Sequence, residues 1–223
     1  MKGGKGMKGM KGMKGMKGMK GLKGIIFVVF CMLYVPAQSQ SMRTVFGNLP
    51  ESVDMLIDSL RRQDLMDLFE AGHQSGIMNV FNENCQLLDF SNAYLKLECG
   101  AVQLELALLP LINDSKIICC IKTACAPICD SRLAFYTTNW NPLDANDLIT
   151  PVAANWFFQE ETIPVIDNFP DFDLMQYTFI PDRQELVQTY NSPKYLSKEA
   201  QEKIEPLLKN TGKIYEWKKN GFK

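Results

Sequence analysis

Six cysteines follow residue 40 of this 223-residue chain, and their thiols are its first candidates for chemistry. An even number of cysteines in an exported protein is typical of disulfide pairing. The alternative is that the thiols stay reduced and fill the core as small hydrophobic side chains. The six residues are Cys85, Cys99, Cys119, Cys120, Cys125 and Cys129.

The strands expected around these cysteines decide which of them can pair. Alternating apolar and polar residues, separated by turn residues, predict an antiparallel meander. Its four strands are expected at residues 92–99, 101–109, 116–124 and 131–139. Up-and-down order brings Cys99 to the same end of the sheet as the turn from Cys125 to Cys129. We therefore expect Cys99 to pair with Cys125 or Cys129, or Cys125 to pair with Cys129 across their own turn.

Metal binding and catalysis find less support in the sequence. Cys125 and Cys129 could share a zinc ion, but a closed site needs four ligands and a second close pair is missing. The single histidine, His73, follows a glycine in an expected loop, without the nucleophile motif that serine or cysteine hydrolases use. A carboxylate-dependent hydrolase is the least favoured function, because no acidic pair is distinctive. We expect no catalytic residue, no metal and no cofactor.

Three tryptophans are candidate stacking platforms for a small ligand or glycan. They are Trp140, Trp156 and Trp217. The sequence Trp156-Phe157-Phe158 is too apolar to face water as a whole, which favours core packing for that segment. A pocket that exposes one tryptophan would favour ligand binding, whereas burial of all three would exclude it.

The meander is preceded by residues with helical spacing. Pro50 and Glu51 suit a first helical turn, and apolar residues recur from Val53 to Leu60. Asp64 is expected to cap a second helix that ends at Gly72. We expect this helical hairpin to cover the packed face of the sheet, whose other face is partly exposed to water.

A second half follows Trp140. We expect a helix over residues 147–161, a β-hairpin of residues 174–181 and 185–190, a helix over 198–208 capped by Ser197, and a final strand over 213–217. The predicted fold class is α+β: an N-terminal helical hairpin packed on an antiparallel β-meander, with a second helix-plus-antiparallel-strand half. The halves span residues 42–140 and 141–223 and can be continuous with each other.

Residues 1–39 have the features of an export signal. A lysine-rich tract of Met-Lys-Gly repeats precedes an apolar run of 11 residues, Ile25 to Val35, and small residues follow up to Ser39. A membrane-spanning helix needs roughly 20 residues. We therefore predict a signal peptide, with a disordered repeat ahead of it, and export to the periplasm or cell surface. Contact with the membrane is expected only before cleavage.

The remaining chain is acidic. The first 40 residues contain eight of the 24 basic residues and no acidic one, which leaves 16 basic against 25 acidic residues and a formal charge of −9. Nucleic-acid binding is disfavoured, because it needs clustered lysine and arginine.

Several short motifs in order resemble a family of exported proteins of Bacteroides-group bacteria, known as domain of unknown function 3256. They are Met42-Arg43-Thr44-Val45-Phe46, Leu49-Pro50-Glu51-Ser52, Asp64-Leu65-Met66-Asp67, Tyr94-Leu95-Lys96-Leu97, the segment 133–140 and Ile214-Tyr215-Glu216-Trp217. The resemblance spans nearly the whole exported chain. It implies no activity and transfers no site residue, because the family has none assigned.

The function expected from the sequence is a non-enzymatic periplasmic or cell-surface module that binds an envelope protein or peptide. The broad sheet could present one face to such a partner, and convergent polar motifs are missing. The alternative is a small-ligand or glycan-binding protein that uses the tryptophans.

Overall fold

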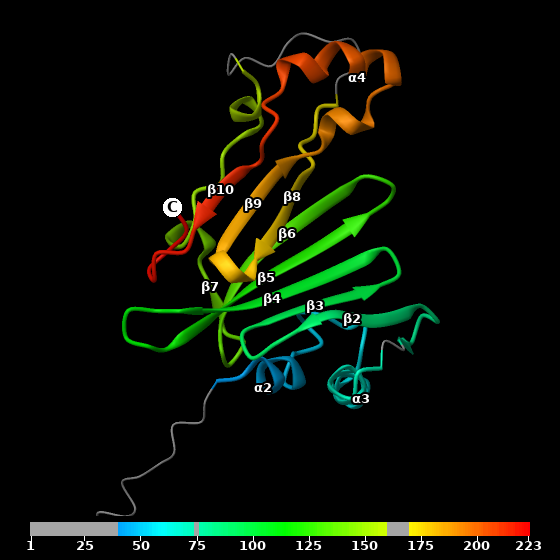
Figure 1. Ribbon diagram of the computed structural model, residues 1–223, viewed down its shortest axis with the longest axis vertical. Coiled ribbons are helices and arrows are strands. Elements are labelled where there is room, and N and C mark those ends of the chain that lie inside the picture. The colour runs from blue at the N-terminus through cyan, green and yellow to red at the C-terminus, as the bar shows by residue number, and fades with distance from the viewer. Residues whose placement is uncertain (1–39, 74–75, 160–169) are drawn as a thin grey trace, which may run out of the picture. The chain divides into compact units, whose positions relative to one another are not determined.

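Two antiparallel β-sheets form the centre of the chain (Figure 1). The computed structural model describes residues 40–73, 76–159 and 170–223. Gln40 to Lys223 form one compact unit. The predicted signal peptide and its repeat lie outside the described residues.

The large sheet has seven strands in strictly sequential order. They are β1 (Ile77–Met78), β2 (Asn84–Phe90), β3 (Tyr94–Cys99), β4 (Val102–Pro110), β5 (Lys116–Cys125), β6 (Cys129–Thr137) and β7 (Pro142–Leu143). Every neighbouring pair is antiparallel. The predicted meander is confirmed, and its four strands correspond to β3–β6. The flanking strands β1, β2 and β7 extend it.

The small sheet has the order β10-β9-β8. Its strands are β8 (Met175–Ile180), β9 (Glu185–Tyr190) and β10 (Lys213–Glu216). The hairpin between β8 and β9 turns through the 3-10 helix η3 (Pro181–Arg183), and Gln184 closes the turn at φ 51°. Both the predicted hairpin and the predicted final strand are present.

The helices before the large sheet differ from the prediction. They are α2 (Met42–Gly47) and α3 (Ser59–Glu70). The helix expected from Pro50 to Leu60 is wrong, because Asp54 accepts a hydrogen bond from Leu56 N, a local contact that competes with helical pairing. Asp58, not Asp64, caps α3 by accepting from Arg61 N. The region is therefore two helices joined by an irregular loop, residues 48–58.

Both faces of the central strands are packed. The expectation that one face is partly exposed to water is therefore wrong for these strands. The first face packs against α2, α3 and the 48–58 loop through residues such as Phe46, Leu65 and Leu95. The second face packs against the small sheet through residues such as Leu109, Phe135 and Phe179. In β4 all six residues from Leu104 to Leu109 are consequently buried.

Side chains of the large sheet complete the hydrogen bonding of β8. The β8 backbone N–H groups of Met175, Tyr177 and Phe179 donate to the side-chain oxygens of Asp130, Ser131 and Glu105 at 2.9, 3.0 and 3.2 Å. These N–H groups at the edge of the small sheet therefore have acceptors on the strands of the large sheet. The two halves of the sequence share one core as a result.

The second half contains less helix than expected. The single helix expected over residues 147–161 is wrong for its described part, which contains only the end of η1 (Ala145–Asp147) and η2 (Ala154–Phe157). Pro151 lies between them and cannot donate a helical hydrogen bond. The later helix is confirmed as α4 (Lys198–Ile204), with Ser197 as its cap. Flanking it are η4 (Ser192–Tyr195) and η5 (Glu205–Leu207). Among the described helices, none has the length and apolar character needed to cross a membrane.

Candidate protein-binding surface

Two disulfides lie at one end of the large sheet. Cys85 of β2 is joined to Cys99 of β3, and Cys125 is joined to Cys129 across the turn between β5 and β6. The second pairing is one of those considered from the sequence. The first replaces the expected bond from Cys99 to Cys125 or Cys129. Because β2 was not among the four delineated strands, the sequence did not show that Cys85 lies directly opposite Cys99.

The two remaining thiols lie mid-strand in β5. Cys119 and Cys120 are both buried and unbonded, and they belong to the cores on opposite faces of the sheet. Burial raises the pKa of both thiols, to about 12 for Cys120. Protonated thiols are poor nucleophiles and poor metal ligands, so these two act as core residues. Two disulfides in one domain are typical of an oxidising compartment outside the cytoplasm.

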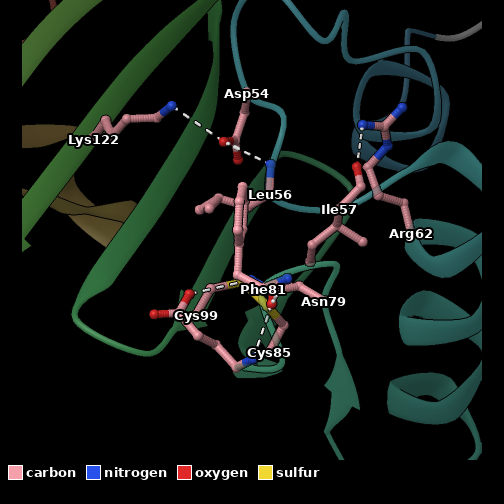
Figure 2. The surroundings of a disulfide bond; sticks show 10 residues. Asp54, Leu56, Ile57, Arg62, Asn79, Phe81, Cys85, Cys99 and Lys122 are labelled. Atoms are coloured by element: carbon pink, nitrogen blue, oxygen red, sulfur yellow. Dashed lines mark hydrogen bonds and ion pairs between the residues drawn. A yellow bond between two sulfur atoms is a disulfide. The ribbon is translucent and has the colours of Figure 1, made fainter.

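We call the end that carries the disulfides the disulfide end. It comprises the 48–58 loop, the turn of residues 79–83 between β1 and β2, and the turn of residues 125–129. Figure 2 shows the first two of these segments around the bond between Cys85 and Cys99. The disulfides and several buried polar contacts fix the backbones of these segments.

A half-buried ion pair fixes the 48–58 loop. Lys122 of β5 donates to Asp54 Oδ1 at 3.2 Å and to the carbonyl oxygen of Val53 at 3.0 Å. The Asp54 side chain is only 3% exposed, whereas that of Lys122 is 35% exposed, so the carboxylate is shielded from solvent and the ammonium group is partly hydrated. The dashed line from Lys122 to Asp54 in Figure 2 marks the contact that holds the loop over the sheet.

A buried arginine supports the same loop from its helical side. Arg62 of α3 donates to the carbonyl oxygens of Ile57 at 2.9 Å and Gly47 at 3.4 Å. Burial lowers the pKa of its guanidinium group below the ordinary value. Arg62 therefore links both ends of the loop through backbone acceptors.

Asn79 organises the turn between β1 and β2. It is buried, and its Oδ1 accepts from the backbone N–H groups of Phe81 and Glu83, both at 2.9 Å. Its Nδ2 donates to Glu83 Oε2 at 3.2 Å. Asx contacts of this kind define a turn without help from regular strand pairing.

These fixed loops hold three large apolar side chains in solvent. Met55 is 66% exposed, Val80 63% and Phe81 60%. Single exposed apolar residues are common, but several on adjoining rigid loops are typical of an interaction surface. No motif or spacing in the sequence indicates this surface, because exposure depends on where the loops lie in the folded protein.

The three tryptophans do not form a common platform. Trp140 and Trp217 are buried, and their indole N–H groups donate to the carbonyl oxygens of Val45 at 3.1 Å and Pro110 at 2.8 Å. Trp156 is half-buried, and its neighbours Phe157 and Phe158 are core residues, as expected. His73 is exposed after α3. Within residues 40–73, 76–159 and 170–223, no group of three or more acidic, histidine or cysteine side chains could hold a metal ion.

The fold and its disulfide end define an α+β protein of two antiparallel sheets with disulfide-braced loops. The chain belongs to the family described as protein of unknown function (DUF3256), whose model matches residues 34–222. No curated protein matches it. Its fold is similar to the structure of a domain of an uncharacterized protein from Porphyromonas gingivalis W83, with a TM-score of 0.65 and 23% identity over 80% of this chain and 96% of the other.

Proposed function

We propose that the exported chain is a non-enzymatic module of the periplasm or cell surface that binds an envelope protein or peptide through its disulfide end. The observation that carries this proposal is the exposure of Met55, Val80 and Phe81 on loops with fixed backbones. Such loops lose little conformational entropy on binding, which favours affinity.

The charges at this surface indicate the chemistry of the partner. Lys122 is paired with Asp54, and Arg61 is paired with Asp58. Glu51 is exposed and forms no ion pair within the described part of the chain. Residues beyond the signal also carry a formal charge of −9. These features favour a partner segment with apolar side chains flanked by basic residues.

Site-specific photo-crosslinking in the native envelope tests this proposal. A crosslinker at position 81 is expected to give a discrete product with one envelope protein. The matched control is position 112, because Ile112 is 74% exposed and lies in the turn between β4 and β5, at the other end of the large sheet. Position 112 is expected to give no such product.

A substitution at the disulfide end tests whether its side chains contribute to binding the crosslinked partner. Val80→Ser is expected to weaken binding of the captured partner by about tenfold or more, whereas Ile112→Ser leaves it unchanged. Titration of the purified partner by calorimetry measures both affinities. Identical products from positions 81 and 112, or equal affinities for the two variants, would contradict the proposal.

Small-ligand or glycan binding is the second candidate function. The specific observation in its favour is Trp156, which retains solvent exposure while Trp140 and Trp217 are buried. Lys209 and Lys213 lie over the Trp156 ring and favour an anionic ligand.

A further inference from the structure

We propose that Trp156, Lys209 and Lys213 form a binding site for the carboxylate of an acidic sugar. This site is separate from the disulfide end and rests on the second candidate function. Trp156 comes from η2, Lys213 from β10, and Lys209 from the segment after η5.

Two ammonium groups lie over one indole ring. The Nζ of Lys209 is 4.4 Å from the centroid of Trp156, and that of Lys213 is 5.6 Å from it and 5.4 Å from the ring of Tyr215. Lys209 also donates to the backbone carbonyl oxygen of Trp156. Neither lysine forms an ion pair with any described carboxylate.

Among the residues that the structure describes, the two lysines are consequently a pair of positive charges without a carboxylate partner. An exposed cation–π contact contributes only about 0.5–1 kcal/mol. Charge-assisted hydrogen bonds to a carboxylate are stronger than neutral ones. An incoming carboxylate therefore gains both cations without breaking any ion pair that the described residues form.

A small cavity has Lys209 in its wall, and Lys213 directly follows its last wall residue, Gly212. Its volume is about 230 Å³. Its wall contains Phe157, Thr189, Tyr190, Glu205, Leu208 and residues 209–212. Cavities for drug-sized ligands are usually about 300–1,000 Å³, so this one suits a single ring.

The cavity wall combines groups that suit a sugar. Phe157 and Tyr190 are stacked at 5.6 Å, and these almost fully buried rings form the apolar floor of the cavity. Thr189 and Asn210 can exchange hydrogen bonds with hydroxyl groups, and Glu205 can accept from them. A purely apolar ligand would leave these polar groups unpaired, whereas a sugar with a carboxylate satisfies both the polar wall and the lysines.

The local backbone fixes the spacing of the site. Lys209 N donates to the carbonyl oxygen of Phe157 at 2.8 Å, which joins this segment to η2. Gly212 lies so close to β9 that an added Cβ would be 2.8 Å from the carbonyl oxygen of Gln188. These contacts hold residues 209–213 in place before any ligand arrives.

NMR titration of the ¹⁵N-labelled full chain tests the proposal. Sodium glucuronate is the probe, and glucose and sodium sulfate are the comparison ligands. Glucuronate is expected to shift the backbone amides of residues 209–213 and the indole N–H of Trp156, with a dissociation constant on the order of 1 mM. Glucose and sulfate are expected to bind at least about tenfold more weakly.

Charge-matched variants separate the site from nonspecific attraction. The double variant Lys209→Gln/Lys213→Gln should weaken glucuronate binding at least about tenfold, while Lys219→Gln, at an exposed lysine, leaves it unchanged. Unperturbed amide signals elsewhere establish that each variant is folded.

Three results would overturn the proposal. Equal shifts with glucose show that the carboxylate is not recognised, equal shifts with sulfate show an anion site without sugar selectivity, and an unaffected double variant shows that the lysines play no part. Val80→Ser, which tests the disulfide end, should leave the titration unchanged, so the two proposals fail independently.

Discussion

Glu105 links the two sheets through a buried carboxylate. It is 3% exposed in β4, and its carboxylate accepts from Tyr94 Oη at 2.8 Å, Lys96 Nζ at 3.3 Å and Phe179 N at 3.2 Å. Glu105 alternates with apolar residues in the sequence, a pattern that is typical of the water-exposed face of a sheet. The small sheet covers that face, and the carboxylate becomes a buried acceptor.

Replacing Glu105 with leucine should therefore strongly destabilise the protein. Glu105→Leu leaves the donors of Tyr94, Lys96 and Phe179 without their acceptor, and loss of one partner from such a buried network reduces the free energy of unfolding by about 3–5 kcal/mol. Urea denaturation measures the change. The control is Glu98→Leu, at a half-buried position in β3, for which we expect a loss below about 1 kcal/mol. Similar losses for both variants would show that Glu105 is not a junction residue.

At the scale of elements, the position of the cap distinguishes the observed α3 from the helix expected in the sequence. Asp58 accepts from Arg61 N at 2.9 Å, whereas Asp64 lies within the helix and is exposed. Asp58→Ala should lower the free energy of unfolding by about 1 kcal/mol, because it removes the cap. Asp64→Ala should be neutral or slightly stabilising, because alanine is the better helix former. Thermal unfolding compares the two, and the reverse order would favour a helix that starts at Asp64.

Comparison of the expected with the observed elements shows which of them could be predicted from the sequence. The strands β3–β6 and the hairpin of β8 and β9 combine regular alternation with turn residues, and both signals are local. The errors fall where local signals conflict. Pro50 and Glu51 resemble a helix start, but the bonds from Asp54 to Leu56 N and Lys122 shape a loop instead. The lysine is distant in sequence, so local pattern could not reveal it.

The proposed binding surfaces are less predictable than the strands, because they too depend on contacts between residues distant in sequence. Trp156 was identified as a candidate from its residue type alone. Its two lysines come from a segment more than 50 residues later, and only the packing of η2 against β10 brings them together. The exposed side chains of Met55 and Val80 likewise lie on loops whose positions are set by tertiary structure rather than by spacing along the chain.

At the scale of the whole molecule, a doubly covered sheet has a consequence for pH dependence. Burial raises the pKa of Tyr177, Tyr190 and Cys120 to about 12. In the unfolded chain these groups ionise at about 10 for tyrosine and about 8.5 for cysteine. Above those values the folded protein keeps protons that the unfolded chain has released. The stability contribution is therefore complete below about pH 8.5 and is lost as the pH rises toward 12.

Tyr177 gives a direct test of this alkaline loss, because it lies on β8 between the two sheets. Between about pH 10 and its folded pKa of about 12, Tyr177 should contribute a fall of about 1.4 kcal/mol in unfolding free energy per pH unit. Tyr177→Phe removes this proton, so the variant should lose stability less steeply over that range. Urea denaturation at several pH values measures the slopes. The control, Tyr195→Phe, alters a side chain that is 61% exposed and should keep the wild-type slope. Equal slopes for all three proteins would mean that the inner face of the small sheet admits water, which would contradict the closed packing of the two sheets.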